Sequence, residues 1–290
     1  MRKGGNVDYV RVGSLAELGD ALERDGALLI AGGTDLMVKM RAGSVHPRLL
    51  VDISRVDALR EISTQPSGLT IGSAALVAEI LASATVSTHY PLLATVLRSL
   101  GSAQIRNRAT LGGNLANASP AADSPLALLA YDAHVTLARA GTERDLPLHE
   151  FFLGPGRTAL ARGEYIRSVD LPTPRTDWEV FFHKVGRRRA LTIAIASVAG
   201  LIALRGRAVV DVRLVAGSVA PTPLRLRAVE DLVRGRELDG ERIAAAHAAA
   251  FREVSPIDDV RATALYRRTV ASDLVARFLR EPKGSPCVSP

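Results

Sequence analysis

Two pairs of adjacent glycines are the strongest candidates for a binding site in this sequence. They lie in Ala31-Gly32-Gly33-Thr34-Asp35-Leu36 and in Thr110-Leu111-Gly112-Gly113-Asn114-Leu115. Each pair closes an apolar run and precedes a helical pattern, so we expect a strand, a glycine turn and a helix at both places. Consecutive glycines let neighbouring backbone N–H groups converge on an anion, and the start of a helix adds its positive end. Both elements predict a cradle for the pyrophosphate of a dinucleotide; an ordinary tight turn is the alternative for either pair alone.

Other chemical motifs are missing from the sequence. Neither G-x-G-x-x-G nor G-x-x-x-x-G-K-[ST] occurs, so the Rossmann and P-loop fingerprints are both absent. The one cysteine, Cys287, cannot by itself build a disulfide, a zinc site or an iron–sulfur cluster. The histidines, His183 among them, show no metal-ligand spacing. We therefore expect no metal in this chain, and we expect any iron–sulfur cluster to come from a partner.

The first half of the chain carries the elements that would position the glycine pairs. Ser14-Leu15-Ala16-Glu17 has the spacing of a capping box and predicts a helix that stops at Asp25-Gly26. Apolar runs predict strands over 27–31, 49–53 and 69–72, and more irregular strand patterns follow at 135–137 and 165–171. Helical spacing of apolar residues recurs over 76–81 and 91–100.

The pair of prolines in Pro172-Thr173-Pro174 predicts a domain boundary, because neither a helix nor a central strand continues easily through X-Pro bonds. Beyond it we expect strands over 179–185, 193–204 and 209–216, followed by helices over 224–233, 240–251 and 259–279. Strands followed by helices, without regular alternation, favour a compact α+β domain. The predicted division is therefore 1–174 and 175–282, with a flexible tail over 283–290.

Composition limits the class of protein. The chain has 290 residues, 47% of them hydrophobic, which is enough apolar material for a sizeable core. No apolar run spans a bilayer and no signal-type run follows the start, so we expect a cytoplasmic protein without membrane insertion. The net charge of +7 comes from scattered arginines. The cluster Arg187-Arg188-Arg189 lacks interleaved aromatic residues, so we expect a solvated or partner-facing loop rather than a nucleic-acid site.

The glycine elements and several later motifs resemble the FAD-binding medium subunits of the molybdenum hydroxylases, the xanthine dehydrogenase and carbon monoxide dehydrogenase type. The second glycine element continues through Ala116-Asn117-Ala118-Ser119-Pro120-Ala121-Ala122-Asp123. The resemblance covers nearly the whole chain, and the further motifs that carry it are Gln104-Ile105-Arg106-Asn107, Phe151-Phe152-Leu153-Gly154, Gly163-Glu164, Gly217-Ser218-Val219-Ala220-Pro221-Thr222-Pro223 and Asp259-Val260-Arg261-Ala262-Thr263-Ala264-Leu265-Tyr266-Arg267.

The resemblance implies an α+β protein with a vanillyl-alcohol-oxidase (PCMH) type FAD-binding fold of two lobes, about 1–58 and 59–174, plus a C-terminal α+β domain of antiparallel sheet and helices. It implies a non-covalent FAD whose pyrophosphate is wrapped by two loops. The residues of these loops are Leu29, Ile30, Ala31, Gly32, Gly33, Thr34, Asp35 and Leu36 in the first, and Thr110, Leu111, Gly112, Gly113 and Asn114 in the second.

Three further residues receive roles from the resemblance. Asp123 would accept hydrogen bonds from ribityl or ribose hydroxyls, and the alternative is an N-cap for a helix beginning near Ser124. Ile166 would line the isoalloxazine pocket, and the alternative is plain strand core. Lys184 would lie nearest the flavin ring, where a cation stabilises negative charge on reduction, and the alternative is a solvated strand lysine.

Arg106 and Arg108 would contact either FAD phosphate or a neighbouring subunit, and we favour a subunit interface for Arg108. As the family implies, this subunit would work beside a small subunit with two 2Fe-2S clusters and a large subunit with the molybdenum cofactor, as a dimer of heterotrimers. Electrons would pass from the clusters through FAD to NAD or another acceptor. The form of the loops favours xanthine or another N-heterocycle as the substrate of the complex, with a carbon monoxide or aldehyde dehydrogenase as the alternative.

Two other classes compete. A self-contained flavin oxidase would need its own substrate cavity and commonly a covalent tether, yet no cysteine lies near either loop. A nucleic-acid-binding or pure interaction protein is suggested only by the basic charge. Because Cys287 is the only thiol, the branch of the family with an extra cluster in this subunit is excluded.

Overall fold

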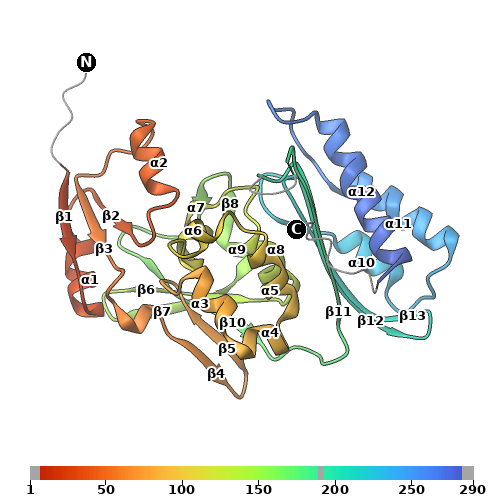
Figure 1. Ribbon diagram of the computed structural model, residues 1–290, viewed down its shortest axis with the longest axis horizontal. Coiled ribbons are helices and arrows are strands. Elements are labelled where there is room, and N and C mark those ends of the chain that lie inside the picture. The colour runs from red at the N-terminus through yellow and green to blue at the C-terminus, as the bar shows by residue number, and fades with distance from the viewer. Residues whose placement is uncertain (1–6, 189–192, 283–290) are drawn as a thin grey trace.

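The computed structural model describes residues 7–188 and 193–282. The predicted tail, Cys287 and Arg189 lie outside the described residues. Three main sheets follow one another along the molecule, from the N-terminal lobe to the C-terminal helices (Figure 1).

The N-terminal lobe is a small parallel sheet with two helices. Its strands pair in the order β1-β3-β2. Ser14 caps the first helix by accepting a hydrogen bond from the Glu17 N–H at 3.2 Å, but the Glu17 carboxylate accepts from Gly13 N–H rather than closing a capping box. The elements are β1 Asp8–Arg11, α1 Leu15–Leu22, β2 Ala27–Ile30, α2 Leu36–Arg41 and β3 Leu49–Asp52.

The second lobe is an antiparallel sheet of order β4-β5-β10-β6-β7 with a group of helices. The strands are β4 Ile62–Gln65, β5 Gly68–Gly72, β6 His134–Arg139, β7 Thr142–Pro147 and β10 Tyr165–Pro172, and β8 Phe152–Gly154 pairs separately with β9 Arg157–Thr158. The helices are the 3-10 turn η1 Asp57–Leu59, α3 Val77–Ala82, α4 Ala84–His89, α5 Pro91–Arg98, α6 Ala103–Arg106, α7 Leu111–Asn117, α8 Ser124–Ala130 and α9 Leu148–Phe151.

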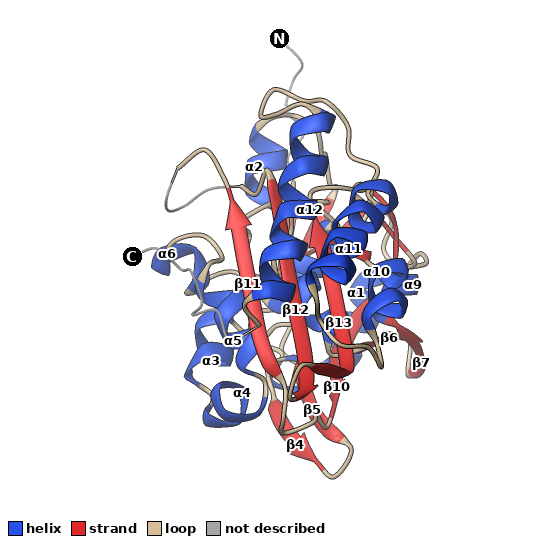
Figure 2. Cartoon of the chain, turned by 90° about the vertical axis from the view of Figure 1, so that its right-hand side faces the viewer, coloured by secondary structure: helices blue, strands red, loops and turns tan. Residues whose placement is uncertain are grey.

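The C-terminal part is an antiparallel sheet of order β11-β12-β13-β14 that is covered on both faces. Its elements are β11 Glu179–Val185, β12 Ala196–Arg205, β13 Ala208–Gly217, β14 Leu224–Arg225, α10 Arg227–Val233, α11 Gly240–Glu253 and α12 Ala264–Arg280. Figure 2 shows α10, α11 and α12 in front of one face of this sheet, and α5 and α8 of the second lobe contact the other face.

The double coverage explains the sequence of the central strand β12. Ala199 and Leu201 belong to the core shared with the second lobe, whereas Val198 and Ile202 belong to the core under the C-terminal helices. A strand buried on both faces needs apolar residues throughout, so it reads as a continuous apolar run rather than an alternating one.

The prediction for the second glycine pair was wrong in one respect. Gly112 and Gly113 do not close a strand; they lie inside the first turn of α7, which begins at Leu111. The strands β1, β4, β7, β8 and β9 and the short helices α4, α6 and α9 were not predicted, and the helix predicted over 224–233 begins instead with the short strand β14. The first turn of α7 accommodates glycine at position 112 because this residue packs directly on Ser73, where a Cβ would come within 2.8 Å of the Ser73 carbonyl oxygen. At Gly113 a Cβ would lie 2.9 Å from the Thr110 hydroxyl oxygen.

Candidate functional site

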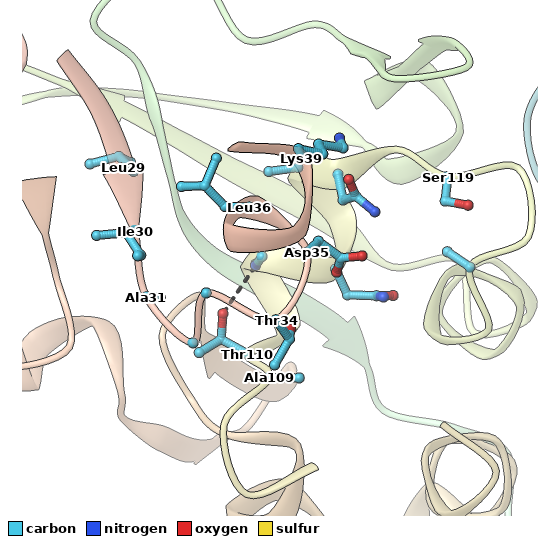
Figure 3. Close-up of a pocket in the computed structure, with 18 of the residues that line it drawn as sticks. Leu29, Ile30, Ala31, Thr34, Asp35, Leu36, Lys39, Ala109, Thr110 and Ser119 are labelled. Atoms are coloured by element: carbon cyan, nitrogen blue, oxygen red, sulfur yellow. Dashed lines mark hydrogen bonds between the residues drawn. The ribbon is translucent and has the colours of Figure 1, made fainter. Parts of the chain in front are cut away.

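A cavity of about 610 Å³ lies between the two glycine elements and the edge of the C-terminal sheet. Its volume is in the range of sites for small molecules and cofactors. Of the sixteen predicted site residues, all but Leu111 line it, and Leu111 is fully buried behind it. Figure 3 shows the loop from Ala31 to Asp35 facing Thr110, with Leu36 and Lys39 of α2 beside it.

The first glycine loop presents free backbone donors to this cavity. Within the described part of the chain, no backbone N–H from Gly32 to Asp35 donates a hydrogen bond. Gly33 has a φ of +70°, a left-handed conformation that glycine adopts without steric cost. At Gly32, a Cβ would lie 1.9 Å from the Arg108 carbonyl oxygen. The loop is therefore a set of unused amides on a backbone that requires both glycines, which suits an anion.

The second glycine element differs because its amides are already occupied. The Leu111 N–H donates to the Ala75 carbonyl at 3.2 Å, and the Gly112 N–H donates to the Ser73 carbonyl at 2.8 Å. The Thr110 hydroxyl caps the Gly113 N–H at 3.1 Å, drawn as the dashed line in Figure 3. This element thus forms a wall of the cavity, and only the first glycine pair lies in a loop whose amides are free.

Asp123 and Lys184 form a buried ion pair on the cavity wall. The Lys184 Nζ lies 2.5 Å from Asp123 Oδ2 and also donates to the Ser99 carbonyl at 3.3 Å. Asp123 Oδ1 is buried without any hydrogen-bond partner. Burial raises the pKa of the Asp123 carboxyl, and the Lys184 ammonium opposes that rise. The predicted alternative is wrong for Lys184, whose side chain is not solvated. Asp123 does occupy the N-cap position of α8, as its alternative predicted, but its side chain makes no capping hydrogen bond.

Ile166 lies both in the core and on the cavity wall, and its contact with an isoalloxazine ring stays a prediction. It is 5% exposed, belongs to the main core and also lines the cavity from β10. Other residues that line the cavity were assigned no site role from the sequence, although Glu164 and Arg261 lie in motifs that carry the resemblance. These lining residues include Leu28, Lys39, Val45, Leu160, Glu164, Tyr165, Ile193 and Arg261.

The remaining charged candidates lie outside this cavity. Arg106 donates to the Leu100 and Gly101 carbonyls, at 3.2 and 2.9 Å, and so holds its own loop. Arg108 is exposed and lines a second, smaller cavity of about 180 Å³ behind the Gly32 backbone. For His183, burial and Arg277 lower the pKa. Among residues 7–188 and 193–282, no group of three or more His, Cys, Asp or Glu could hold a metal ion.

Comparison with known proteins agrees with this geometry. The family model described as the FAD binding domain in molybdopterin dehydrogenase matches residues 5–174, and that of the CO dehydrogenase flavoprotein C-terminal domain matches residues 181–282. The chain belongs to this family of FAD-binding medium subunits of molybdenum-containing dehydrogenases.

Individual relatives are similar over almost their whole length. The glyceraldehyde dehydrogenase medium chain of Sulfolobus acidocaldarius is 32% identical, over 94% of this chain and 97% of the relative. The nicotine 6-hydroxylase medium subunit of Paenarthrobacter nicotinovorans is 30% identical, over 95% and 96%. A chain in the structure of carbon monoxide dehydrogenase from Hydrogenophaga pseudoflava superposes with a TM-score of 0.90 at 30% identity, over 95% of this chain and 96% of that one.

These findings confirm four of the predictions. The family, the α+β FAD-binding fold, FAD as the cofactor and the class of enzyme, a flavoprotein subunit of a molybdenum-containing dehydrogenase, are as expected. The domain boundary near residue 174 stays a prediction. No helix in the described ranges is long and apolar enough to cross a membrane.

Proposed function

We propose that this chain holds a non-covalent FAD in the 610 Å³ cavity and transfers electrons from the 2Fe-2S clusters of a small subunit to NAD or another acceptor. A large subunit with the molybdenum cofactor would oxidise the substrate, and the whole would be a cytoplasmic dimer of heterotrimers. The observation that carries the proposal is the pairing of unused loop amides with a buried carboxylate across one cavity. When bound, FAD supplies the chemistry, since a flavin takes up electrons singly and gives them up as a hydride.

The residues of this chain then have distinct tasks. The N–H groups from Gly32 to Asp35 would bind the pyrophosphate, because they are free and directly precede the start of α2. Asp123 would accept a hydroxyl hydrogen bond through its unpartnered Oδ1, which removes the cost of leaving that oxygen buried and unpaired. Lys184, fixed by Asp123, would supply positive charge beside the ring, and Ile166 would supply an apolar contact.

For the substrate of the complex we propose xanthine or another N-heterocycle. The support is the loop Asn117-Ala118-Ser119-Pro120-Ala121-Ala122-Asp123 and the Gly-Gly-Thr-Asp form of the first element. The names of similar subunits refer to glyceraldehyde, nicotine and carbon monoxide. The substrate assay therefore also includes an aldehyde and carbon monoxide. The test is to purify the complex through a tag on this chain and measure reduction of an electron acceptor with xanthine, glyceraldehyde and carbon monoxide in turn.

The chain alone distinguishes this proposal from a self-contained flavin oxidase. We expect the isolated chain, loaded with FAD, to oxidise none of these substrates while the complex does. Oxidation of a substrate by the isolated chain would contradict the subunit assignment. Reduction of NAD by the substrate-treated complex would support NAD as the acceptor, whereas reduction of an artificial dye alone would favour another acceptor.

A further inference from the structure

Apolar side chains gather on the surface at the N-terminal end of α12. Val260 is 87% exposed, Ile257 73%, Leu265 65% and Tyr266 48%. They lie within ten residues of one another, and we call these four side chains the 257–266 patch. A cluster of exposed apolar side chains marks an interaction site more often than single scattered ones do. We propose that the 257–266 patch is the docking surface for the small 2Fe-2S subunit, an inference that rests on the proposed function.

The backbone that displays the patch is held firmly. Arg267 is buried and donates to the carbonyls of Ile195 and Ser218, at 2.8 and 3.0 Å, and to Asp259 at 2.6 Å. The same Asp259 oxygen accepts from Arg261 N–H at 2.8 Å and from Ala262 N–H at 3.2 Å. A segment fixed in this way loses little conformational entropy when a partner binds, which favours association.

Two further contacts fix the ends of the patch. The Asp258 carboxylate accepts a hydrogen bond from Ala264 N–H, and the Thr263 hydroxyl caps Tyr266 N–H at 3.2 Å. On the other side, the Arg187 guanidinium donates to the carbonyls of Val260 and Arg261. The molecule thus uses its polar groups to hold the backbone while Val260 and Leu265 point to solvent, an arrangement that folding alone does not require.

The position of the patch identifies which subunit it fits. Arg261 lies within the same segment and lines the cavity, as Lys184 of β11 does, and the Arg261 carbonyl accepts a hydrogen bond from Arg187, which follows β11. In Figure 1 helix α2 and the start of α12 both lie on the upper side of the molecule, and the cavity is lined by Leu36 and Lys39 of α2 and by Arg261, which precedes α12. The subunit that delivers electrons must reach the flavin, so it must dock beside this cavity, and the 257–266 patch is an exposed apolar surface there.

The charge around the patch favours an acidic partner. Residues 187–188 and 257–268 contain five arginines and two carboxylates. Arg267 is buried and paired with Asp259, so four arginines that are at least partly exposed remain, and the two carboxylates are engaged with the backbone, Arg261 and Arg267. Within the described residues, Arg188 makes no ion pair. A 2Fe-2S cluster on four thiolates is itself anionic. We therefore expect the docking face of the iron–sulfur subunit to be apolar with a rim of carboxylates.

The test uses the whole complex. The chain is tagged and expressed in its own cells as wild type, as the double variant Val260→Glu/Leu265→Glu, and as the control Leu153→Glu, whose leucine is 57% exposed on β8. Co-purified subunits are identified by mass spectrometry, with FAD content and melting temperature measured for each. We expect the double variant to keep its FAD and melting temperature while losing the iron–sulfur subunit at least about tenfold, and the control to keep it.

Several results would overturn the inference. A double variant that retains the iron–sulfur subunit at the wild-type level, or that loses only the molybdenum subunit, excludes this docking role. If the double variant instead lost only self-association of this chain, the 257–266 patch would bind a second copy of the chain and not the iron–sulfur subunit. A wild-type chain without FAD or without any iron–sulfur partner would contradict the proposed function itself, which keeps the two failures distinct.

A second measurement does not depend on charge substitution. A photo-crosslinking amino acid at position 260 is expected to join this chain to the iron–sulfur subunit, and the same group at position 153 is not. A crosslink from position 260 to the molybdenum subunit, or to another copy of this chain, would contradict the inference even if the double variant fails to fold.

Discussion

The Nζ of Lys184 lies 2.5 Å from Oδ2 of Asp123, although the two residues are 61 positions apart in sequence. Both side chains are almost buried, at 10% and 7% exposure, so neither charge is solvated and each depends on the other. The pair joins β11 of the C-terminal sheet to the loop before α8. It thereby sets one wall of the cavity and ties the C-terminal sheet to the second lobe.

Removing the cation should expose that dependence. We expect Lys184→Met to lower the free energy of unfolding by about 3 kcal/mol at pH 7, because it leaves a buried, unpaired carboxylate. Burial then raises the folded-state pKa of Asp123 further, so the folded variant binds a proton more readily than the unfolded chain does. Its stability should therefore rise, relative to wild type, as the pH falls from 7 to 5.

The check is denaturant unfolding at both pH values, together with the double variant Asp123→Asn/Lys184→Met. The double variant should recover part of the stability that Lys184→Met loses, because no buried charge is left. Equal losses at both pH values, or no recovery in the double variant, would show that the pair is not a coupled ion pair.

The first glycine loop should not tolerate a methyl group. We expect Gly32→Ala to weaken FAD binding by at least about tenfold, because the new Cβ would lie 1.9 Å from the Arg108 carbonyl oxygen and must displace the loop. Gly19→Ala in α1 is the matched control, since nothing lies within 4 Å of its Cβ and alanine suits a helix interior. Fluorescence titration of the apoprotein with FAD measures both, and unchanged affinity in Gly32→Ala would argue against the loop as the anion site.

The C-terminal sheet should depend on a buried carboxylate of α10. Glu230 is fully buried and accepts hydrogen bonds from Leu214 N–H at 2.7 Å and from Arg225 Nε at 2.5 Å. We expect Glu230→Gln to lower the free energy of unfolding by about 3 kcal/mol, since it leaves part of the Arg225 charge unpaired. The exposed neighbour pair of Asp231 and Arg234 is the control, and Asp231→Asn should cost less than about 0.5 kcal/mol. Similar losses in both variants would contradict this assignment.

Acid should weaken the N-terminal lobe first. Burial alone would raise the pKa of Asp52, but hydrogen bonds from Tyr9, Ser54 and Arg11 outweigh it and lower the pKa from 3.8 to about 2. A lowered folded-state pKa contributes stability above about pH 4 that disappears as the pH falls towards 2. Tyr9→Phe should make the melting temperature less dependent on pH between 4 and 2. An unchanged pH profile in that variant would remove Tyr9 from the network.

The sequence predicted most of the elements because their signals are local. Ser14 and the apolar spacing after it marked α1, and the continuous apolar run of β12 marked a strand even though its two faces enter different cores. The short edge strands β1 and β4 were missed because four half-exposed residues leave little periodicity. The resemblance, rather than any local pattern, connected the glycine pairs to one cofactor.

The features of the site that the sequence did not predict depend on contacts between distant segments. Whereas the Thr110 cap of Gly113 is local, the Ser73 and Ala75 carbonyls accept hydrogen bonds from the Gly112 and Leu111 amides, although both carbonyls lie much earlier in the chain. The same holds for Lys184, which only the pairing of β11 with β12 and its packing on the second lobe bring to Asp123. The positions of the glycine pairs therefore predicted which segments surround the cavity, but not which of their backbone N–H groups stay free of hydrogen bonds.

We expect the cavity to hold a non-covalent FAD. The most direct test is the visible absorption spectrum of the purified chain before and after acid precipitation, with the released nucleotide identified by mass spectrometry. We predict a flavin spectrum that moves entirely to the supernatant, with one FAD per chain. A colourless chain that also fails to bind added FAD would contradict FAD binding in this cavity, and a flavin that stays with the precipitate would contradict non-covalent binding.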